Sequence, residues 1–476
     1  MLYNYLILYF RNLNKDRIRL LNILSIALTL AFAMLILFFV EDELSYDRWN
    51  ENSDRIYRVA TYEKWPAKQF FNATSTICTG PILQSEFPEI KSFVRFSRNR
   101  DPRVVIGSNE FIEEKFFFAD SSLFELFPYD LSAGSRQGAL SKPNSMVLSE
   151  DLAIKYFDEK QPLGRTLQVN GETYTITGII DNKPNSHLQF NALLSFLPDE
   201  LDQAKDGSKS ITNCGATVYT YILAHENADI EQLQSKLPGF YDKYFDFGEG
   251  YDYKIVFEPL AEIHFSDRKL ENDLPTMNKK YIHIFEALLV IIMIFSIINY
   301  INLVVGKSIK TGKFIGLNKM YGISKGQIFS YFISDSLINA IIASIIGLAL
   351  LLLLLPGYNA NFNKDLTINM LGNKHILIST VFLLMLVGVV PGVMLALIFI
   401  PIKPLFILKN QLVKRNRTIR KVFVFLEISL LAIVVMGIII VNFQLYNLKN
   451  KNLSFNKKNI VLIDIKNPEL VKKAYT

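Results

Sequence analysis

Five long apolar segments interrupt an otherwise ordinary pattern of polar and apolar positions. They cover residues 22–40, 287–305, 337–355, 376–400 and 422–441. A helix needs about 20 apolar residues to cross a hydrocarbon core of about 30 Å, and each segment is long enough to do so. The pattern therefore predicts a multi-span α-helical membrane protein.

The long stretch between the first two apolar segments, residues 41–280, is patterned like a water-soluble domain. It mixes alternating or β-branched runs, typical of strands, with helical spacing. An Asn-Gly pair marks a tight hairpin turn, because both residues accept positive φ angles. We therefore expect a large α+β domain with its own core, inserted between the first and second transmembrane helices. The predicted elements are strands at 55–61, 92–97 and 217–224, a hairpin at 167–180, a helix at 149–157 with Ser149 as N-cap, and a helix at 227–245 interrupted near Pro238.

Positive charge is concentrated beside alternate spans. The net charge is +6, and the three most basic segments together contain one acidic residue, Asp16. This distribution follows the positive-inside rule and places the N-terminus and these segments in the cytoplasm, with the large domain outside. It argues against a nucleic-acid surface. The basic residues are Arg11, Lys15, Arg17 and Arg19 before the first span, Lys307, Lys310, Lys313, Lys319 and Lys325 after the second, and Lys403, Lys409, Lys414, Arg415, Arg417, Arg420 and Lys421 between the fourth and fifth.

The sequence lacks the common signatures of catalysis. Gly306-Lys307-Ser308 has Ile301 where a P-loop needs its first glycine, so ATP hydrolysis is not predicted for this chain. The five histidines show no paired spacing typical of metal ligands, and GxSxG and CxxC motifs are absent. We expect no catalytic residue, no metal and no cofactor.

Polar side chains interrupt two of the apolar segments. Asn299 and Asn302 are three residues apart and share a helix face, and Asp335 lies near the inner start of the third span. Such groups commonly hydrogen-bond to neighbouring helices, so helix packing is the favoured interpretation. The rival hypothesis is a substrate or proton path that also includes Glu286.

Both cysteines, Cys78 and Cys214, lie in the predicted outer domain. In an oxidising compartment they can pair, but sequence alone does not fix the distance between their Cα atoms. A disulfide therefore stays one of two alternatives.

Seven sequence pieces, in order, resemble the MacB/FtsX-like family of ABC transporter permeases in its long form. They are RNLNKDRIRLLNILSIALTLAFAM, YDRWNENSDRIYRV, TGPILQSEFPEIKSFVRF, LSEDLAIKYFDEKQPLGRTLQVNG, DNKPNSHLQFNALLSF, INYINLVVGKS with the loop to residue 324, and FIPIKPLFILKN followed by RKVFVFLEIS.

The resemblance implies a bacterial inner-membrane permease subunit with a cytoplasmic N-terminus and a periplasmic core domain. Such subunits work with a cytoplasmic ABC ATPase, as a homodimer or with a complementary permease module, in contact with membrane lipids. The implied organisation is an N-terminal cytoplasmic helix (1–21), lying in the interface or extending the first span, TM1 (22–40), the periplasmic domain (41–280), TM2 (283–305), a cytoplasmic coupling loop (306–327), TM3 (328–355), a short periplasmic loop (356–375), TM4 (376–400), a basic linker (401–421), TM5 (422–443) and the start of a second periplasmic segment (444–476).

The loop after the second span is the segment that the resemblance implies docks onto the ATPase. Its candidate residues are Lys307, Lys310, Lys313, Phe314, Gly316, Lys319 and Gly322. Attraction of the basic loop to the anionic cytoplasmic leaflet is a second explanation for its charge. Phe314 stands where the family commonly has an acidic residue, and the family's arginines are missing.

Two functional hypotheses follow. The first is the membrane subunit of an ABC-type transporter or mechanotransmission complex, with ATP hydrolysis in a separate partner. The alternative is a membrane-anchored periplasmic binding or scaffold protein that has lost ATPase coupling, as the departures in the loop would allow. Long family members have a second outer domain and three more spans, so the five-span chain is expected to be a fragment or a naturally shortened form. No constellation of residues identifies a substrate.

Overall fold

The computed structural model describes residues 17–66, 68–183, 185–196, 214, 217–245, 251–266, 270–306, 308–362, 364–401 and 411–449. The chain divides into two compact units. The helical unit comprises Met1–Leu30, Ile291–Leu348 and Phe382–Thr476, and the sheet unit comprises Ala31–Val290 and Ala349–Val381.

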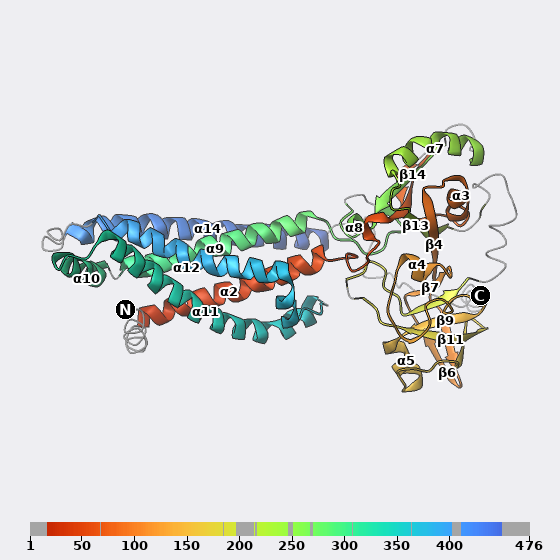
Figure 1. Cartoon of the computed structure of the whole chain (residues 1–476), viewed down its shortest axis with the longest axis horizontal. Helices are drawn as coiled ribbons and strands as arrows, with labels where there is room; N and C mark the ends of the chain where they lie inside the picture. The colour runs from red at the N-terminus through yellow and green to blue at the C-terminus, as the bar shows by residue number, and fades with distance from the viewer. Residues whose placement is uncertain are drawn as a thin grey trace. The chain divides into compact units, whose positions relative to one another are not determined.

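Five helices in the described part of the chain are long and apolar enough to cross a membrane, which confirms the predicted multi-span class. They are α2 (Arg17–Leu44), α9 (Lys280–Gly306), α11 (Lys325–Phe362), α12 (Lys374–Phe399) and α14 (Gln411–Lys449), shown in Figure 1. Most extend beyond the apolar segments that predicted them, because helical hydrogen bonding continues where the side chains become polar.

Two connections predicted as loops differ in the structure. The segment after α9 forms a helix, α10 (Ser308–Met320), although its basic residues and glycines had suggested a loop. Helix α11 continues through Pro356 to Phe362 and is followed by a short 3-10 helix, η3 (Ile368–Gly372). Composition alone did not show that helical hydrogen bonding tolerates these glycines and this proline.

Three glycines let helices of the helical unit approach closely. A Cβ atom at Gly347 would lie 2.9 Å from the carbonyl oxygen of Ala27, and one at Gly392 would lie 2.9 Å from the Cα atom of Ile333. At Gly388 the nearest atom would be Cδ2 of Leu337, at 2.8 Å. Between helices in lipid the hydrophobic effect contributes little, so helix association relies on close van der Waals packing. Small residues at these contacts allow that packing.

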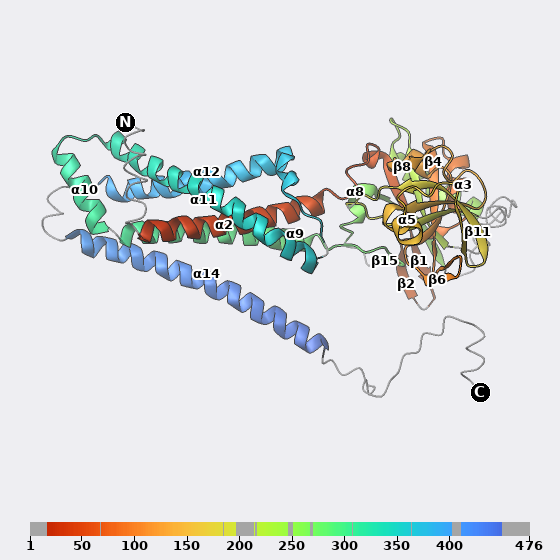
Figure 2. The same ribbon diagram turned by 90° about the horizontal axis from the view of Figure 1, so that it is seen from below.

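Helix α14 is the least covered of the five. No residue of its apolar window, Lys421–Leu448, is buried. Figure 2 shows it as one long continuous helix, and within the helical unit it packs beside α10. Its apolar side chains are therefore not covered by other described residues.

The described residues of the sheet unit form a sheet of 15 strands, which confirms the predicted large mixed domain. The main path runs β15-β2-β1-β13-β4-β7-β12-β9-β11-β10-β5-β6, with β14 beside β1, β3 beside β13 and β8 beside β11. Most neighbours are antiparallel, and β7–β12, β9–β11 and β2–β15 are parallel. The strands are β1 (Ile56–Trp65), β2 (Lys68–Asn72), β3 (Ser75–Thr76), β4 (Ile90–Asn99), β5 (Arg103–Ile106), β6 (Asn109–Ile112), β7 (Phe116–Ala119), β8 (Leu131–Gly134), β9 (Ser145–Ser149), β10 (Thr166–Val169), β11 (Glu172–Ile180), β12 (Ala192–Ser195), β13 (Thr217–Ala224), β14 (Asp252–Pro259) and β15 (Leu270–Glu271).

Helices cover this sheet through apolar side chains. Helices α3 (Thr79–Glu86) and α7 (Ile230–Tyr244) share a buried cluster with β1, β13 and β14, and α5 (Glu150–Phe157) packs on β9 and β11. The hydroxyl of Ser149 accepts a hydrogen bond from the N–H of Leu152, so the predicted N-cap is confirmed. The expected interruption at Pro238 is wrong, because α7 runs through it with Leu237 and Phe240 buried on either side.

The innermost charge of the sheet unit is Arg58, whose side chain is fully buried on β1. Register places it opposite Glu258 on β14. Its Nη2 atom lies 2.7 Å from Oε2 of Glu258, and its Nη1 atom lies 2.6 Å from Oδ1 of Asp273. Two carboxylates thus compensate one guanidinium that has no access to water.

Replacing this arginine with an apolar residue of similar length should be costly. Arg58→Met leaves Glu258 and Asp273 in a largely dry site without their partner, and we expect the free energy of unfolding to fall by about 3–5 kcal/mol. Thermal unfolding of the detergent-solubilised protein measures this. Arg103, paired with Glu110 where both side chains are half exposed, supplies the control. Arg103→Met should cost less than about 1 kcal/mol, and equal losses in both variants would contradict the assignment.

Candidate functional site

The C-terminal end of α2 is attached to the sheet by a buried hydrogen-bonded chain. Asp47, just past the helix, has a φ of 59° and is buried. Its Oδ2 atom lies 2.8 Å from Nδ1 of His187, and Nε2 of His187 lies 2.8 Å from the hydroxyl of Tyr221 on β13. All three side chains are buried, so the end of α2 is tied directly to a central strand.

Backbone groups reinforce the same attachment. The N–H of Asp47 donates to the carbonyl of Asn185 at 2.8 Å, and the side chain of Asn185 donates to Oγ of Ser45 at 2.5 Å. Further along, the amide of Asn50 donates to the carbonyl of Leu126 at 2.8 Å. Two of the sequence pieces that carry the family resemblance, YDRWN and NSHLQF, therefore meet in space and hold each other.

A second network gathers around two acidic residues in the last turn of α2, Asp42 and Glu43. Nζ of Lys364 lies 2.7 Å from carboxylate oxygens of both Asp42 and Glu43. The other oxygen of Glu43 lies 2.6 Å from Nε2 of His264, whose ring stacks on Tyr46 with centroids 3.6 Å apart. Burial alone would lower the pKa of Lys364, but hydrogen bonds and attraction from the two carboxylates raise it. Lys364 follows α11, so this network joins α2 to the segment between α11 and α12.

Helix α10 of the helical unit exposes an apolar face. Phe314, Leu317 and Tyr321 follow one another at i, i+3 and i+7, and their side chains are 49%, 58% and 89% exposed. Met320 beside them is 72% exposed. A short helix of a membrane protein that turns such residues outward has an unsatisfied apolar surface, which points to a partner or to lipid.

The predicted coupling residues are distributed around this helix. Lys313 and Phe314 are exposed, Gly316 is buried, and Gly322 takes a φ of 86° in the turn after α10. Lys319 donates to the carbonyl of Ile400 at 2.5 Å, so it holds α10 to the end of α12. Burial lowers the pKa of Lys319, and nearby Lys325 lowers it further. Lys307 lies outside the described residues, as does the side chain of Lys310.

The three predicted intramembrane residues contact different helices. Asn299 donates to Oγ of Ser25 on α2 at 2.8 Å. Asn302 donates to Glu427 on α14 at 3.0 Å. Asp335 on α11 accepts from Arg19 on α2 at 3.1 Å. The two asparagines thus join α9 to two different helices, while their role in packing stays a prediction.

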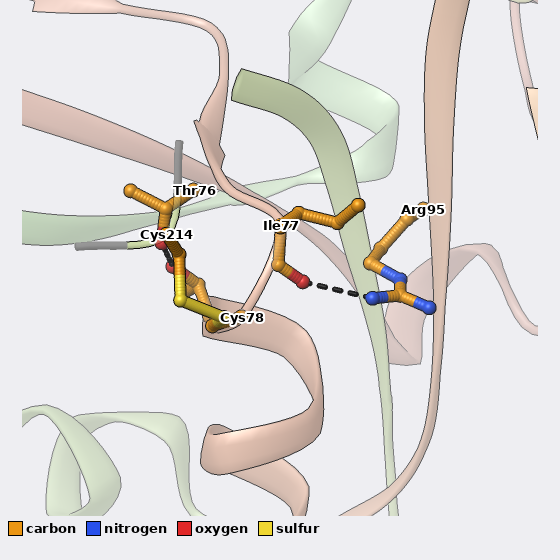
Figure 3. Close-up of a disulfide and its surroundings, with 6 residues drawn as sticks. Thr76, Ile77, Cys78, Arg95 and Cys214 are labelled. Carbon is orange, nitrogen blue, oxygen red and sulfur yellow. Dashed lines mark hydrogen bonds between the residues drawn. A yellow bond between two sulfur atoms is a disulfide. The ribbon is translucent and has the colours of Figure 1, made fainter. Parts of the chain in front are cut away.

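Cys78 and Cys214 are joined by a disulfide, with their Cα atoms 6.1 Å apart (Figure 3). Cys78 immediately precedes α3. Beside it, the carbonyl of Ile77 accepts a hydrogen bond of 2.9 Å from Arg95, which also pairs with Asp120. The bridge and the buried arginine together fix the segment between β3 and α3.

Several residues of these networks were missed from the sequence. Glu427 stands in an apolar helix, and a lone carboxylate there is itself a signal that could have drawn attention. Lys364 and His264 gave no signal, because their acidic partners on α2 are hundreds of positions away in the chain. Asp47 and His187 both lay in quoted pieces of the resemblance, but nothing in the sequence paired them.

Comparison with known proteins finds similarity over α2 and much of the sheet unit. Residues 20–239 match the family model of the MacB-like periplasmic core domain. An uncharacterized ABC transporter permease, YknZ of Bacillus subtilis, is 21% identical over 233 residues, which cover 46% of this chain and 49% of that protein. The chain thus spans about half the length of the curated relative it matches.

Three solved structures show a weak likeness to this chain. A domain of a permease protein from Porphyromonas gingivalis is 18% identical with a TM-score of 0.39, covering 50% of this chain and 98% of that one. The periplasmic region of MacB from Actinobacillus actinomycetemcomitans is 12% identical with a TM-score of 0.28, covering 41% and 87%. The extracellular domain of YknZ from Gram-positive bacteria is 14% identical, also with a TM-score of 0.28, covering 41% and 99%.

The predicted resemblance to MacB/FtsX-like ABC transporter permeases is confirmed by the family model and the YknZ match. Five helices in the described part of the chain are long and apolar enough to cross a membrane, and the match to the MacB-like periplasmic core domain begins within the first of them.

Breaking the buried hydrogen-bonded chain should loosen the attachment of α2. In His187→Phe, Asp47 and Tyr221 lose buried partners, and we expect the free energy of unfolding to fall by about 1.5–3 kcal/mol. Hydrogen exchange at residues 45–50 should accelerate together with that loss. The exposed His225 on the same unit gives the control His225→Phe, and slow exchange at residues 45–50 in both variants would count against the attachment.

The disulfide should contribute to stability through the 136 positions that separate its cysteines. We expect Cys78→Ser with Cys214→Ser to lower the free energy of unfolding by about 2–4 kcal/mol, because the unfolded chain is no longer cross-linked. Thermal unfolding with and without reductant checks this. The double variant should be insensitive to reductant, and a wild-type protein equally insensitive would show that the bridge contributes nothing.

Proposed function

We propose that this chain is the membrane subunit of an ABC-type transporter or mechanotransmission complex in a bacterial inner membrane. A separate cytoplasmic ATPase hydrolyses ATP, and its motion is passed through the spans to the periplasmic domain. The observation that carries the proposal is the exposed apolar face of α10, formed by Phe314, Leu317 and Tyr321. It stands where the resemblance expects ATPase docking.

The geometry of α10 favours a protein partner over a merely electrostatic role. Of its described lysines, Lys313 faces outward and Lys319 is engaged with Ile400, so the basic charge alone does not define a continuous surface. The apolar side chains do, because they recur with helical spacing on one face. Helix-in-groove recognition uses anchors of this type and spacing.

The outer end of α2 has the stiffness that such a mechanism needs. The buried Asp47–His187–Tyr221 chain connects the helix to a central strand without a flexible linker. Lys364 and its two carboxylate partners connect the same helix end to the segment between α11 and α12. A displacement of α2 would therefore move the strands rather than bend a hinge.

Oligomerisation through a second copy or a complementary permease module is part of the proposal. Helix α14 supports it, because its apolar window has no buried residue. Within that window Glu427 accepts a hydrogen bond from Asn302, its one hydrogen-bond partner among the described residues. The alternative function, a periplasmic scaffold without ATPase coupling, is supported by Phe314 at the position of the family's acidic residue.

Placing a charge in the exposed face should prevent docking. We expect Leu317→Glu to lower recovery of a co-expressed Walker-type ABC ATPase by about tenfold or more, because a carboxylate would be buried without a partner. Purification of the tagged chain in mild detergent, with mass-spectrometric quantification of the ATPase, measures the effect.

Two variants control this experiment. Ile112 on β6 is also 58% exposed but lies in the sheet unit, so Ile112→Glu should leave ATPase recovery unchanged. Lys313→Glu tests the basic contribution separately and should reduce recovery less than Leu317→Glu. Stoichiometric ATPase with Leu317→Glu would remove α10 from the docking role, and absence of ATPase from the wild-type preparation would favour the scaffold.

A further inference from the structure

The helical unit has a small polar cavity, partly open to its surface, at the end where α2 begins. Its volume is about 230 Å³, and α2, α9, α10 and α11 all contribute to its wall. Drug-sized ligands occupy pockets of roughly 300–1,000 Å³, so this cavity suits a small group. Its lining residues are Arg19, Asn22, Tyr300, Leu303, Val304, Thr311, Phe314, Tyr331, Phe332, Asp335 and Asn339.

Among the described residues that line it, the cavity contains one charge of each sign. Arg19 and Asp335 form an ion pair of 3.1 Å, with side chains 21% and 15% exposed. The amide of Asn339 lies beside them and donates to the hydroxyl of Tyr300 at 3.2 Å. With formal charges that cancel, the site has no reason to prefer a simple anion or a simple cation.

One buried acceptor in this wall lacks a donor. Oδ1 of Asn22 has no hydrogen-bond partner among the described residues, although Asn22 is only 5% exposed. A buried amide oxygen without a donor costs free energy, so such groups normally find a partner in the protein, in water or in a ligand. A group that satisfies this oxygen must carry N–H or O–H.

The position of the cavity points to a lipid headgroup as the source of that donor. Its residues lie within the first two turns of α2 and beside α10 and the start of α11, next to the basic segments that flank the spans. Under the positive-inside rule this is the cytoplasmic surface of the membrane, at the depth of lipid headgroups. Exposed apolar side chains on α2, Leu21 and Leu24, offer a surface for acyl chains.

We propose that this cavity binds the headgroup of a phospholipid with a primary ammonium, a phosphoethanolamine. The phosphate would pair with Arg19, and the ammonium would donate to Asp335 and to the unpartnered Oδ1 of Asn22. A trimethylated ammonium has the same charge but no N–H to donate, and a glycerol headgroup has no positive charge. The site would thus distinguish phospholipid headgroups by their N–H donors and their positive charge. The inference rests on the proposed membrane topology and is independent of ATPase coupling.

Short-chain lipids test the headgroup preference on the full-length protein in detergent. Dioctanoyl phosphatidylethanolamine, phosphatidylcholine and phosphatidylglycerol are titrated separately while the thermal midpoint is followed. We expect half-saturation by phosphatidylethanolamine at a concentration about tenfold or more below the other two. The mono- and dimethylated ethanolamine lipids should fall between, as each methyl group removes a donor. Equal half-saturation by phosphatidylcholine would overturn the proposal.

A matched pair of asparagine variants locates the site. Asn22→Leu should raise the half-saturating concentration of phosphatidylethanolamine about tenfold and leave that of phosphatidylcholine unchanged. Asn299→Leu removes a different amide of the helical unit, one that does not line the cavity, and should change neither. Equal effects of the two variants would overturn the assignment to Asn22. If Asn22→Leu does not fold, the methylation series on the wild-type protein decides.

A last arm distinguishes a membrane lipid from a soluble compound. Free phosphoethanolamine has the same headgroup chemistry without acyl chains, and we expect no shift at concentrations where the lipid saturates. If the free compound saturates at the same concentration as the lipid, the site takes a soluble zwitterion and the lipid assignment is wrong. ATPase recovery does not enter any of these measurements, so failure here is distinct from failure of the docking proposal.

Discussion

The attachment of α2 to the sheet depends on one buried carboxylate. Asp47 lies just past the end of a helix, in a left-handed conformation, and places its charge where water does not reach. His187 and its own backbone N–H satisfy that charge, and Tyr221 satisfies the far nitrogen of the histidine. Because a buried charge is tolerated only with its partners in place, the helix end, the loop before β12 and strand β13 must form together. Cooperative assembly of this kind gives a stiff joint.

The other buried charges of the sheet unit are also paired with groups of opposite charge or with hydrogen-bond partners. Arg58 has two carboxylates, Arg95 has Asp120 and a backbone carbonyl, and Lys364 has two carboxylates in turn. A buried pair adds little net stability over apolar packing, but a broken one is strongly destabilising. Such sites therefore contribute more to specifying which elements pack together than to the net free energy of folding. Under the proposed function the domain moves as one body, and this specificity would then be useful, because few alternative arrangements satisfy every charge.

What the sequence could predict was local. The apolar segments, the Asn-Gly hairpin and the Ser149 cap each depend on residues close in the chain, and each was found in the structure. Helix α10 was missed because its many glycines and lysines suggested a loop. Its apolar residues do recur with helical spacing, but on an exposed face. The partners of Asp42, Glu43 and Asp47 were also beyond prediction, since no local pattern links them to Lys364, His264 or His187. Pro238 was misjudged for a related reason: tertiary burial of Leu237 and Phe240 holds α7 through a residue that disfavours helix.

Helix α2 brings the two proposals together without requiring any further contact. It is continuous from Arg17 to Leu44, so its length is about 42 Å at 1.5 Å per residue. Its first turns line the polar cavity with Arg19 and Asn22, and its last turn carries the carboxylates that meet Lys364 and His264. An occupant that pairs with Arg19 and Asp335 would bridge α2 and α11 at the inner end, which is the end where the proposed ATPase delivers force. Lipid composition would then set how tightly α2 and α11 move as one. Phe314 lines the cavity and also belongs to the exposed face of α10, so headgroup binding and ATPase docking would share one side chain.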